Sequence, residues 1–158
     1  PAQSQVLEAS CNALKTGAFS KAGFKTYKPD WTNQDSNLVL QLSASRTLMA
    51  VFDGHGLWGH VVSGIVREVF TKLAPDAVGA ADSEMDIVHG LRRLFEAGHR
   101  ELQRFVDQQG RPLSEYSGST CTAVVLDSVR GTAISAHVGD SALAIVSDGR
   151  VLFRSRDH

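Results

Sequence analysis

The chain has 158 residues, of which 42% are hydrophobic and 21% charged, and its formal net charge at pH 7 is −1. This balance is typical of one globular domain; it argues against nucleic acid as a partner, and no apolar run reaches the roughly 18 residues of a membrane span. The two cysteines, Cys11 and Cys121, are far apart and indicate neither a disulfide framework nor a zinc site. We therefore expect an intracellular protein, cytoplasmic or nuclear.

The N-terminal part of the chain has little periodic pattern. Residues 1–36 are polar and interrupted by Gly and Pro, so they predict an irregular approach to the fold, with 1–17 as an irregular N-terminal segment. Two strands are expected next, at residues 37–42 and 47–52, joined by a short polar turn.

Two amphipathic helices should follow these strands. Apolar residues recur at three- and four-residue steps over 58–73 and predict a helix that Pro75 ends. Ser83 and Asp86 have the spacing of a capping box. A second helix should therefore begin there, with an apolar face that continues to Val106.

The C-terminal third predicts only strands. Asp148-Gly149 is a strong signal for a type I′ hairpin turn, because both central residues of that turn need a positive φ. Strands, then helices, then strands, without regular βαβ alternation, indicate the α+β class with an antiparallel sheet. We expect a single domain over 1–158. The expected C-terminal strands span residues 120–126, 132–138, 142–146 and 151–154.

A carboxylate and an imidazole follow the second strand in the stretch Val51-Phe52-Asp53-Gly54-His55-Gly56. An Asp-Gly pair can be a simple turn, but side chains at a strand end are also accessible to ligands. Asp35 precedes the first strand, so both carboxylates are expected to meet at one end of the sheet. Carboxylates with carbonyl oxygens and water suit Mg²⁺ or Mn²⁺. We therefore expect the apolar strand to stop at Asp53 beside a divalent-cation site.

Other chemistries lack their motifs. The sequence contains no nucleotide-binding P-loop and no Gly-x-Ser-x-Gly elbow. A cysteine phosphatase loop needs an arginine six positions after its cysteine, where this chain has Gly17 and Asp127. His55 and His60 are five residues apart, which is wrong for two ligands on one helical face.

A set of motifs, in order along the chain, resembles those of the metal-dependent Ser/Thr protein phosphatases of type 2C. The resemblance runs from about residue 18 to the end, and it implies an antiparallel β-sandwich flanked by α-helices. The later aspartate motifs of that family are absent, so the chain resembles the N-terminal portion of the domain. The motifs are Asn33-Gln34-Asp35, Val51-Phe52-Asp53-Gly54-His55-Gly56, Gly118-Ser119-Thr120, His137-Val138-Gly139-Asp140-Ser141 and Arg156-Asp157-His158.

The resemblance also implies roles for individual residues. Asp53 would bridge two Mg²⁺ or Mn²⁺ ions, Gly54 would offer its carbonyl to one of them, and Asp35 would be a further metal ligand. His55 would be the general acid toward the leaving alkoxide. The implied reaction is hydrolysis of phosphoserine and phosphothreonine in a phosphoprotein substrate by a metal-activated water.

Three positions depart from the family pattern. Gln34 stands where many members have glutamate, and Ala142 replaces the arginine that usually follows Gly-Asp-Ser. Members also have an arginine shortly before the first acidic motif, which holds the substrate phosphate, whereas this chain has Asp30 there. Lys25 and Lys28 are the nearby cations, and they are the predicted phosphate-binding residues.

Two alternative functions stay open. The chain could be a phosphatase-like interaction module that keeps the fold without activity, because only part of the metal set is present. Calcineurin-like metallophosphoesterases also use Asp-x-His-Gly after a strand, but this sequence has no Gly-Asn-His element and has Leu143 where a second aspartate is needed. We expect the isolated chain to be weakly active or inactive. If it is complete, a dimer or a partner chain should complete the sandwich.

Overall fold

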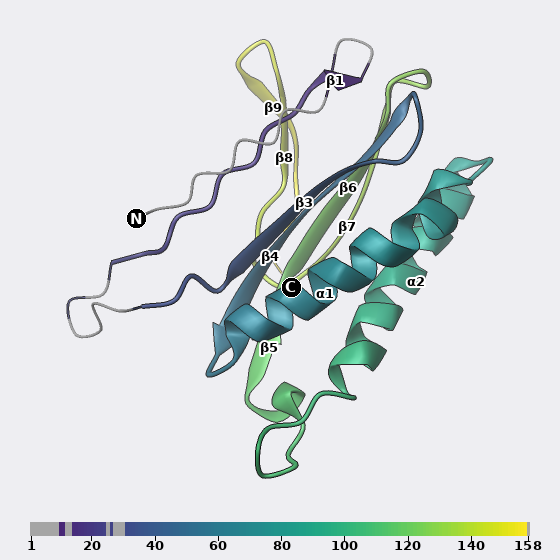
Figure 1. The fold of residues 1–158 in the computed structure, drawn as a ribbon. Coiled ribbons are helices and arrows are strands. Elements are labelled where there is room, and N and C mark those ends of the chain that lie inside the picture. Colours follow the sequence, from purple (N-terminus) through teal and green to yellow (C-terminus); the bar gives the residue numbers. More distant parts are fainter. Residues whose placement is uncertain (1–9, 12–13, 25, 27–30, 158) are drawn as a thin grey trace.

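An antiparallel sheet of five strands forms the centre of the computed structural model, which describes residues 10–11, 14–24, 26 and 31–157 (Figure 1). The strand order is β3–β4–β6–β7, and β5 pairs with β4 beyond the end of β6. Two separate two-stranded sheets are formed by β1 with β2 and by β8 with β9. The strands are β1 (Ser10–Cys11), β2 (Leu14–Lys15), β3 (Asp35–Gln41), β4 (Arg46–Gly56), β5 (Ser117–Ser119), β6 (Cys121–Asp127), β7 (Thr132–Val138), β8 (Ala144–Ser147) and β9 (Arg150–Arg154).

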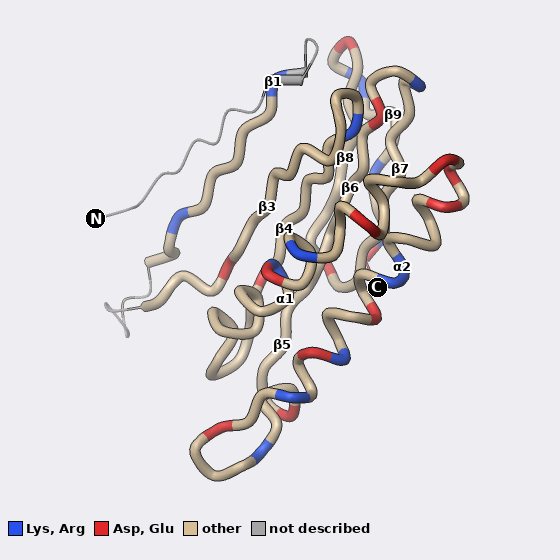
Figure 2. Tube along the Cα trace, turned by 45° about the vertical axis from the view of Figure 1, so that its right-hand side comes forward, with Lys and Arg blue, Asp and Glu red and all other residues tan. Residues whose placement is uncertain are grey.

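Helices α1 (Gly59–Ala74) and α2 (Glu84–Leu102) cover one face of this sheet (Figure 1). Charges of both signs are spread along α2 (Figure 2). A short 3₁₀ helix, η2 (Leu113–Glu115), precedes β5. No helix among the described residues is long and apolar enough to cross a membrane.

The C-terminal ends of the two helices agree with expectation only in part. Helix α1 ends at Ala74, directly before Pro75, as predicted, and Pro75 opens a separate π-helical turn, η1 (Pro75–Gly79), where its missing N–H is accommodated in the first turn. The capping box of α2 is confirmed, since Ser83 Oγ accepts from Asp86 N at 3.1 Å and Asp86 Oδ2 accepts from Ser83 N at 3.0 Å. The helix ends at Leu102, so the prediction that it continues to Val106 is wrong.

Alternate residues of β4 and β6 point toward the helices and form the core with them. The Phe52 ring meets the Phe70 ring of α1 edge-on at 5.3 Å between centroids, and Phe70 meets Phe95 of α2 at 5.5 Å. Side chains alternate along a strand, so burial of Phe52 places Asp53 and His55 on the opposite face of the sheet.

Strand β4 passes through the Asp-Gly-His-Gly stretch, so the prediction that the strand stops at Asp53 is wrong. β6 pairs with residues 46–51 of β4, and β5 takes over the pairing from Gly54 to Gly56. This second partner supplies a hydrogen-bonding neighbour beyond Asp53, and the strand continues. Asp53 lies instead where the partner changes.

Other expectations are confirmed. The turn between β8 and β9 has φ values of 50° at Asp148 and 74° at Gly149, as a type I′ turn requires. The antiparallel sheets and the helical layer confirm the α+β class.

The N-terminal segment differs from expectation. The segment 1–17, expected to be irregular, includes the β1–β2 hairpin among its described residues.

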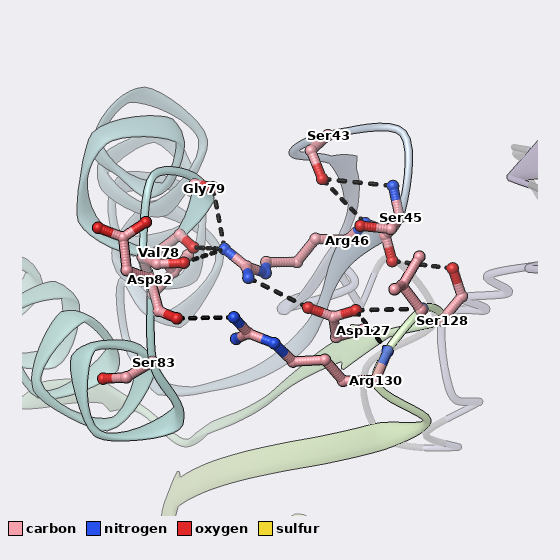
Figure 3. A network of polar contacts seen from close by, with 12 residues as sticks. Ser43, Ser45, Arg46, Val78, Gly79, Asp82, Ser83, Asp127, Ser128 and Arg130 are labelled. Atoms are coloured by element: carbon pink, nitrogen blue, oxygen red, sulfur yellow. Dashed lines mark hydrogen bonds and ion pairs between the residues drawn. The ribbon is translucent and has the colours of Figure 1, made fainter.

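A buried ion pair ties the sheet to the connection between the helices (Figure 3). Arg46 and Asp127 are direct partners across β4 and β6, and Arg46 Nη2 donates to Asp127 Oδ2 at 3.1 Å. Arg46 Nη1 also donates to the carbonyls of Val78, Gly79 and Ala81 at 3.0, 3.0 and 2.9 Å. The main-chain amide of Arg130, followed by the Arg46 guanidinium, lowers the pKa of Asp127.

Loss of this ion pair should strongly destabilise the chain. We expect Arg46→Met to lower the free energy of unfolding by about 3–5 kcal/mol, because it leaves a buried carboxylate without its partner. Arg130→Met removes an exposed arginine that donates to a single carbonyl, that of Asp82, and should cost less than about 1 kcal/mol. Urea unfolding of both variants measures the difference, and equal losses would contradict the central role of Arg46.

Candidate active site

Asp35 and Asp53 face each other as direct partners across β3 and β4. Partial burial raises the pKa of Asp35, and the Asp53 carboxyl raises it further through charge repulsion and a side-chain hydrogen bond. Both residues keep access to solvent. Two carboxylates that repel each other at an accessible sheet end are arranged as a divalent cation requires, because the cation replaces that repulsion with attraction.

The donors in this chain fit one hydrated cation better than two. No three side chains of His, Cys, Asp or Glu form a possible metal cluster within the part of the chain that the structure describes. The candidate donors are the two carboxylates and the main-chain oxygen of Gly54 that the resemblance implies. Mg²⁺ is often held by one or two carboxylates and keeps several waters, so this set suffices for a single ion.

The main chain around the acidic pair is packed too closely for larger residues. A Cβ atom on Gly59 would lie 2.6 Å from Gly54 C and 2.8 Å from Gln34 Nε2. Gln34 O accepts from Gly54 N at 3.1 Å and from Ser63 Oγ at 2.7 Å, while Gln34 Nε2 donates to Gly56 O at 2.8 Å. Gln34, which departs from the family pattern, therefore fixes the Asp-Gly-His-Gly stretch through an amide donor that an ionised glutamate lacks.

His55 is exposed on the same sheet face as Asp53. Its ring lies against Gly118 of β5, where a Cβ atom would approach Cε1 to 2.7 Å and Nε2 to 2.8 Å. The start of β5 is fixed in turn, because Ser117 Oγ accepts from Trp58 N at 2.9 Å. The imidazole thus has one side supported by the main chain and keeps solvent access.

The loop that leads into β5 is held by Asp107. Its carboxylate accepts from Tyr116 Oη at 2.6 Å and from Arg111 Nη2 at 2.8 Å. The Tyr116 hydrogen bond, with those from Arg111 and Gln109, lowers the pKa of Asp107. This network places the segment that supports His55, although none of its members reaches the acidic pair.

Two adjoining hollows share the acidic pair. The larger, of about 420 Å³, contains all of the predicted metal and catalytic residues, and its lining includes Lys21, Trp31, Asp35, Asp53, Gly54 and His55. The smaller, of about 230 Å³, lies on the side of Ser141 and also contains Asp35 and Asp53. The site predicted from the sequence is therefore brought together by the fold, although its individual roles stay predictions.

Among the described residues, a lysine that was not predicted lines the site. Lys25 and Lys28 lie outside the described residues. Lys21 belongs to the N-terminal stretch and lines the larger hollow. Sequence reasoning missed it because this stretch has no periodicity that would show which of its side chains face the sheet. Cys121 is buried, and burial raises the pKa of its thiol, in agreement with the exclusion of a cysteine nucleophile.

Comparison with known proteins gives consistent matches. The family model for protein phosphatase 2C matches residues 22–157. A relative from Streptococcus pyogenes, named as protein phosphatase 2C-type, is 34% identical over 127 residues, which are 80% of this chain and 49% of the relative. Protein phosphatase PhpP of Streptococcus pneumoniae is 28% identical over 134 residues, which are 85% of this chain and 50% of PhpP. The chain thus spans about half the length of these relatives.

Solved structures with the same fold include other phosphatases. The serine-threonine phosphatase 2C of Toxoplasma gondii has a TM-score of 0.70 and 19% identity, and the match covers 100% of this chain and 54% of that one. The serine/threonine phosphatase PstP/Ppp of Mycobacterium tuberculosis has a TM-score of 0.56 and 26% identity, with 80% and 48% coverage. Because the family model spans most of the sequence and these relatives share its type, the chain belongs to the protein phosphatase 2C family.

Proposed function

We propose that the protein to which this chain contributes hydrolyses phosphoserine and phosphothreonine in proteins, with Mg²⁺ or Mn²⁺ held at the Asp35–Asp53 pair. The observation that carries this proposal is the accessible, mutually repelling carboxylate pair in the hollow that also contains His55 and Lys21. The chain would act as one partial phosphatase domain over 1–158. Bound divalent cations lower the pKa of water and neutralise charge on phosphate oxygens.

In this proposal, cation binding, proton donation and phosphate binding are carried out by different residues. Asp35 and Asp53 bind the cation, and the main-chain oxygen of Gly54 adds a neutral donor. His55, on the same face as Asp53, gives a proton to the departing serine or threonine oxygen, since an imidazole can carry a proton near neutral pH. Lys21 places a positive charge at the rim, where a phosphate dianion would enter.

Removal of one carboxylate should weaken cation binding. We expect Asp53→Asn to weaken Mn²⁺ binding to this chain by at least about tenfold in calorimetric titration, because the Asn side chain carries no charge. Asp148→Asn is the matched control, since Asp148 lies in the exposed β8–β9 turn and asparagine accepts its positive φ. Unchanged Mn²⁺ affinity in Asp53→Asn would refute the proposed site.

The catalytic activity of the full-length protein distinguishes an enzyme from an interaction module. Hydrolysis of p-nitrophenyl phosphate should depend on Mn²⁺ or Mg²⁺ and fall by at least about a hundredfold in Asp53→Asn, because transition-state charge loses its stabilisation. Mn²⁺ binding without any turnover of p-nitrophenyl phosphate or of a phosphopeptide would favour the module.

His55→Gln should distinguish leaving groups. Phosphothreonine peptide hydrolysis by the full-length protein should fall by about 10²–10⁴-fold, the usual contribution of general acid catalysis. The loss should be much smaller for p-nitrophenyl phosphate, whose leaving group departs without a proton. Mn²⁺ affinity should change by less than about threefold, whereas a calcineurin-like site would lose a ligand. His60→Gln is the control, and equal losses on both substrates would contradict the general acid role.

Lys21 should contribute to phosphate binding. We expect Lys21→Gln to raise KM for a phosphopeptide by about tenfold with little change in kcat, as loss of one partly solvated charge-assisted contact would do. Lys21→Arg should restore most of the affinity because it keeps the charge. Lys15→Gln, in β2, serves as the control cation. A kcat effect without a KM effect would place Lys21 outside the phosphate contact.

A further inference from the structure

The pairing of β4 is interrupted at Asp53. β6 pairs with β4 as far as Val51 opposite Thr122, and β5 pairs from Gly54 opposite Ser119. Thr120 lies between β5 and β6 and belongs to neither strand. The main chain of Asp53 therefore meets a gap in the ladder, next to a predicted metal ligand.

Thr120 fills this gap with both its main chain and its side chain. Thr120 N donates to Asp53 O at 2.9 Å, and Asp53 N donates to Thr120 Oγ1 at 3.1 Å. A hydroxyl thus replaces the carbonyl that a regular ladder would offer to Asp53 N. Thr120 is 9% exposed, so this hydroxyl is largely removed from water.

The donor in the hydrogen bond between Thr120 and Ser141 can be assigned by counting the acceptors that each hydroxyl proton has. Thr120 Oγ1 lies 2.6 Å from Ser141 Oγ, and it has no other hydrogen-bond acceptor among the described residues. If Ser141 donated, the proton of Thr120 would be buried without an acceptor, which is costly. On this argument we assign Thr120 as the donor to Ser141, which leaves the proton of Ser141 for the smaller hollow that also contains Asp35 and Asp53.

The turn that carries Ser141 packs closely against Thr120. Gly139 has a φ of 94°, and a Cβ atom there would come within 2.7 Å of Thr120 Cγ2. Thr122 Oγ1 also donates to Ser141 O at 2.5 Å. The connection between β7 and β8 is thereby attached to the main chain of Asp53 through a single side chain.

We propose that Thr120 and Ser141 are positioning residues that form a hydroxyl relay and fix Asp53 for cation binding. The relay runs from Asp53 N–H to Thr120 Oγ1–H and on to Ser141 Oγ–H, which ends in the hollow beside the acidic pair. Its effect on cation affinity rests on the proposed function, whereas its effect on the Asp53 amide does not. The relay makes the geometry of a strand residue depend on a distant turn.

The experiment uses hydroxyl deletion and rescue on this chain. Thr120→Val should raise the hydrogen-exchange rate of the Asp53 amide, measured by NMR, by at least about tenfold, because its acceptor is lost. The same variant should weaken Mn²⁺ binding about five- to tenfold. Thr120→Ser should restore both values. Ser141→Ala should weaken Mn²⁺ binding by a few-fold and provides a test if Thr120→Val does not fold.

Thr47→Val is the matched control, because Thr47 is a buried threonine of β4 whose hydroxyl contacts Gln41 away from the site. It should alter neither the Asp53 exchange rate nor Mn²⁺ affinity. The proposal is overturned if Thr120→Val leaves both values unchanged, or if Thr120→Ser fails to rescue them. Wild-type chain that binds no Mn²⁺ would refute the proposed function, and the exchange rates would still decide whether the relay exists.

Discussion

The site depends on the unfavourable contact between two carboxyl groups that the sheet holds together. Asp35 and Asp53 are opposite each other in an antiparallel pair, and the pKa of Asp35 is raised, first by partial burial and then by its neighbour. Like charges directly across a ladder normally destabilise it, so this arrangement persists because the rest of the sheet determines the register. Core packing of Phe52 sets which face Asp53 occupies, since a shift of one residue would bury the carboxylate and expose the ring.

Rigid support around the pair comes from main-chain contacts more than from charged side chains. Gln34 is bonded to the main chain of Gly54 and Gly56, and Gly59 approaches Gly54 too closely for a side chain. On the other side of β4, Thr120 takes the place of a ladder partner. Such contacts fix the backbone without adding charge. The attraction of the site for a cation is therefore left to the two carboxylates.

Local rules predicted the features that depend on neighbours in sequence, and failed where distant segments decide. The predicted hairpin placed Asp35 next to Asp53, and the three-residue spacing of Ser83 and Asp86 predicted the capping box. The continuation of β4 beyond Asp53 depends on β5, which lies about sixty residues later and gives no signal within the stretch itself. Lys21 could not be selected because an aperiodic segment does not reveal which of its side chains line a hollow.

Accessible apolar side chains lie both on the sheet face that carries the site and on the separate β8–β9 hairpin. Val51 of β4, two residues before Asp53, is 47% exposed, and Val151, Leu152 and Phe153 of β9 are likewise exposed. A two-stranded hairpin such as β8–β9 gains little stability alone, so its apolar side chains call for a covering layer. The matched part of this chain covers about half of each relative, so the remaining half of those proteins could supply such a layer there. A layer placed over Val51 would also lie beside Asp53, because the two side chains share one face of β4.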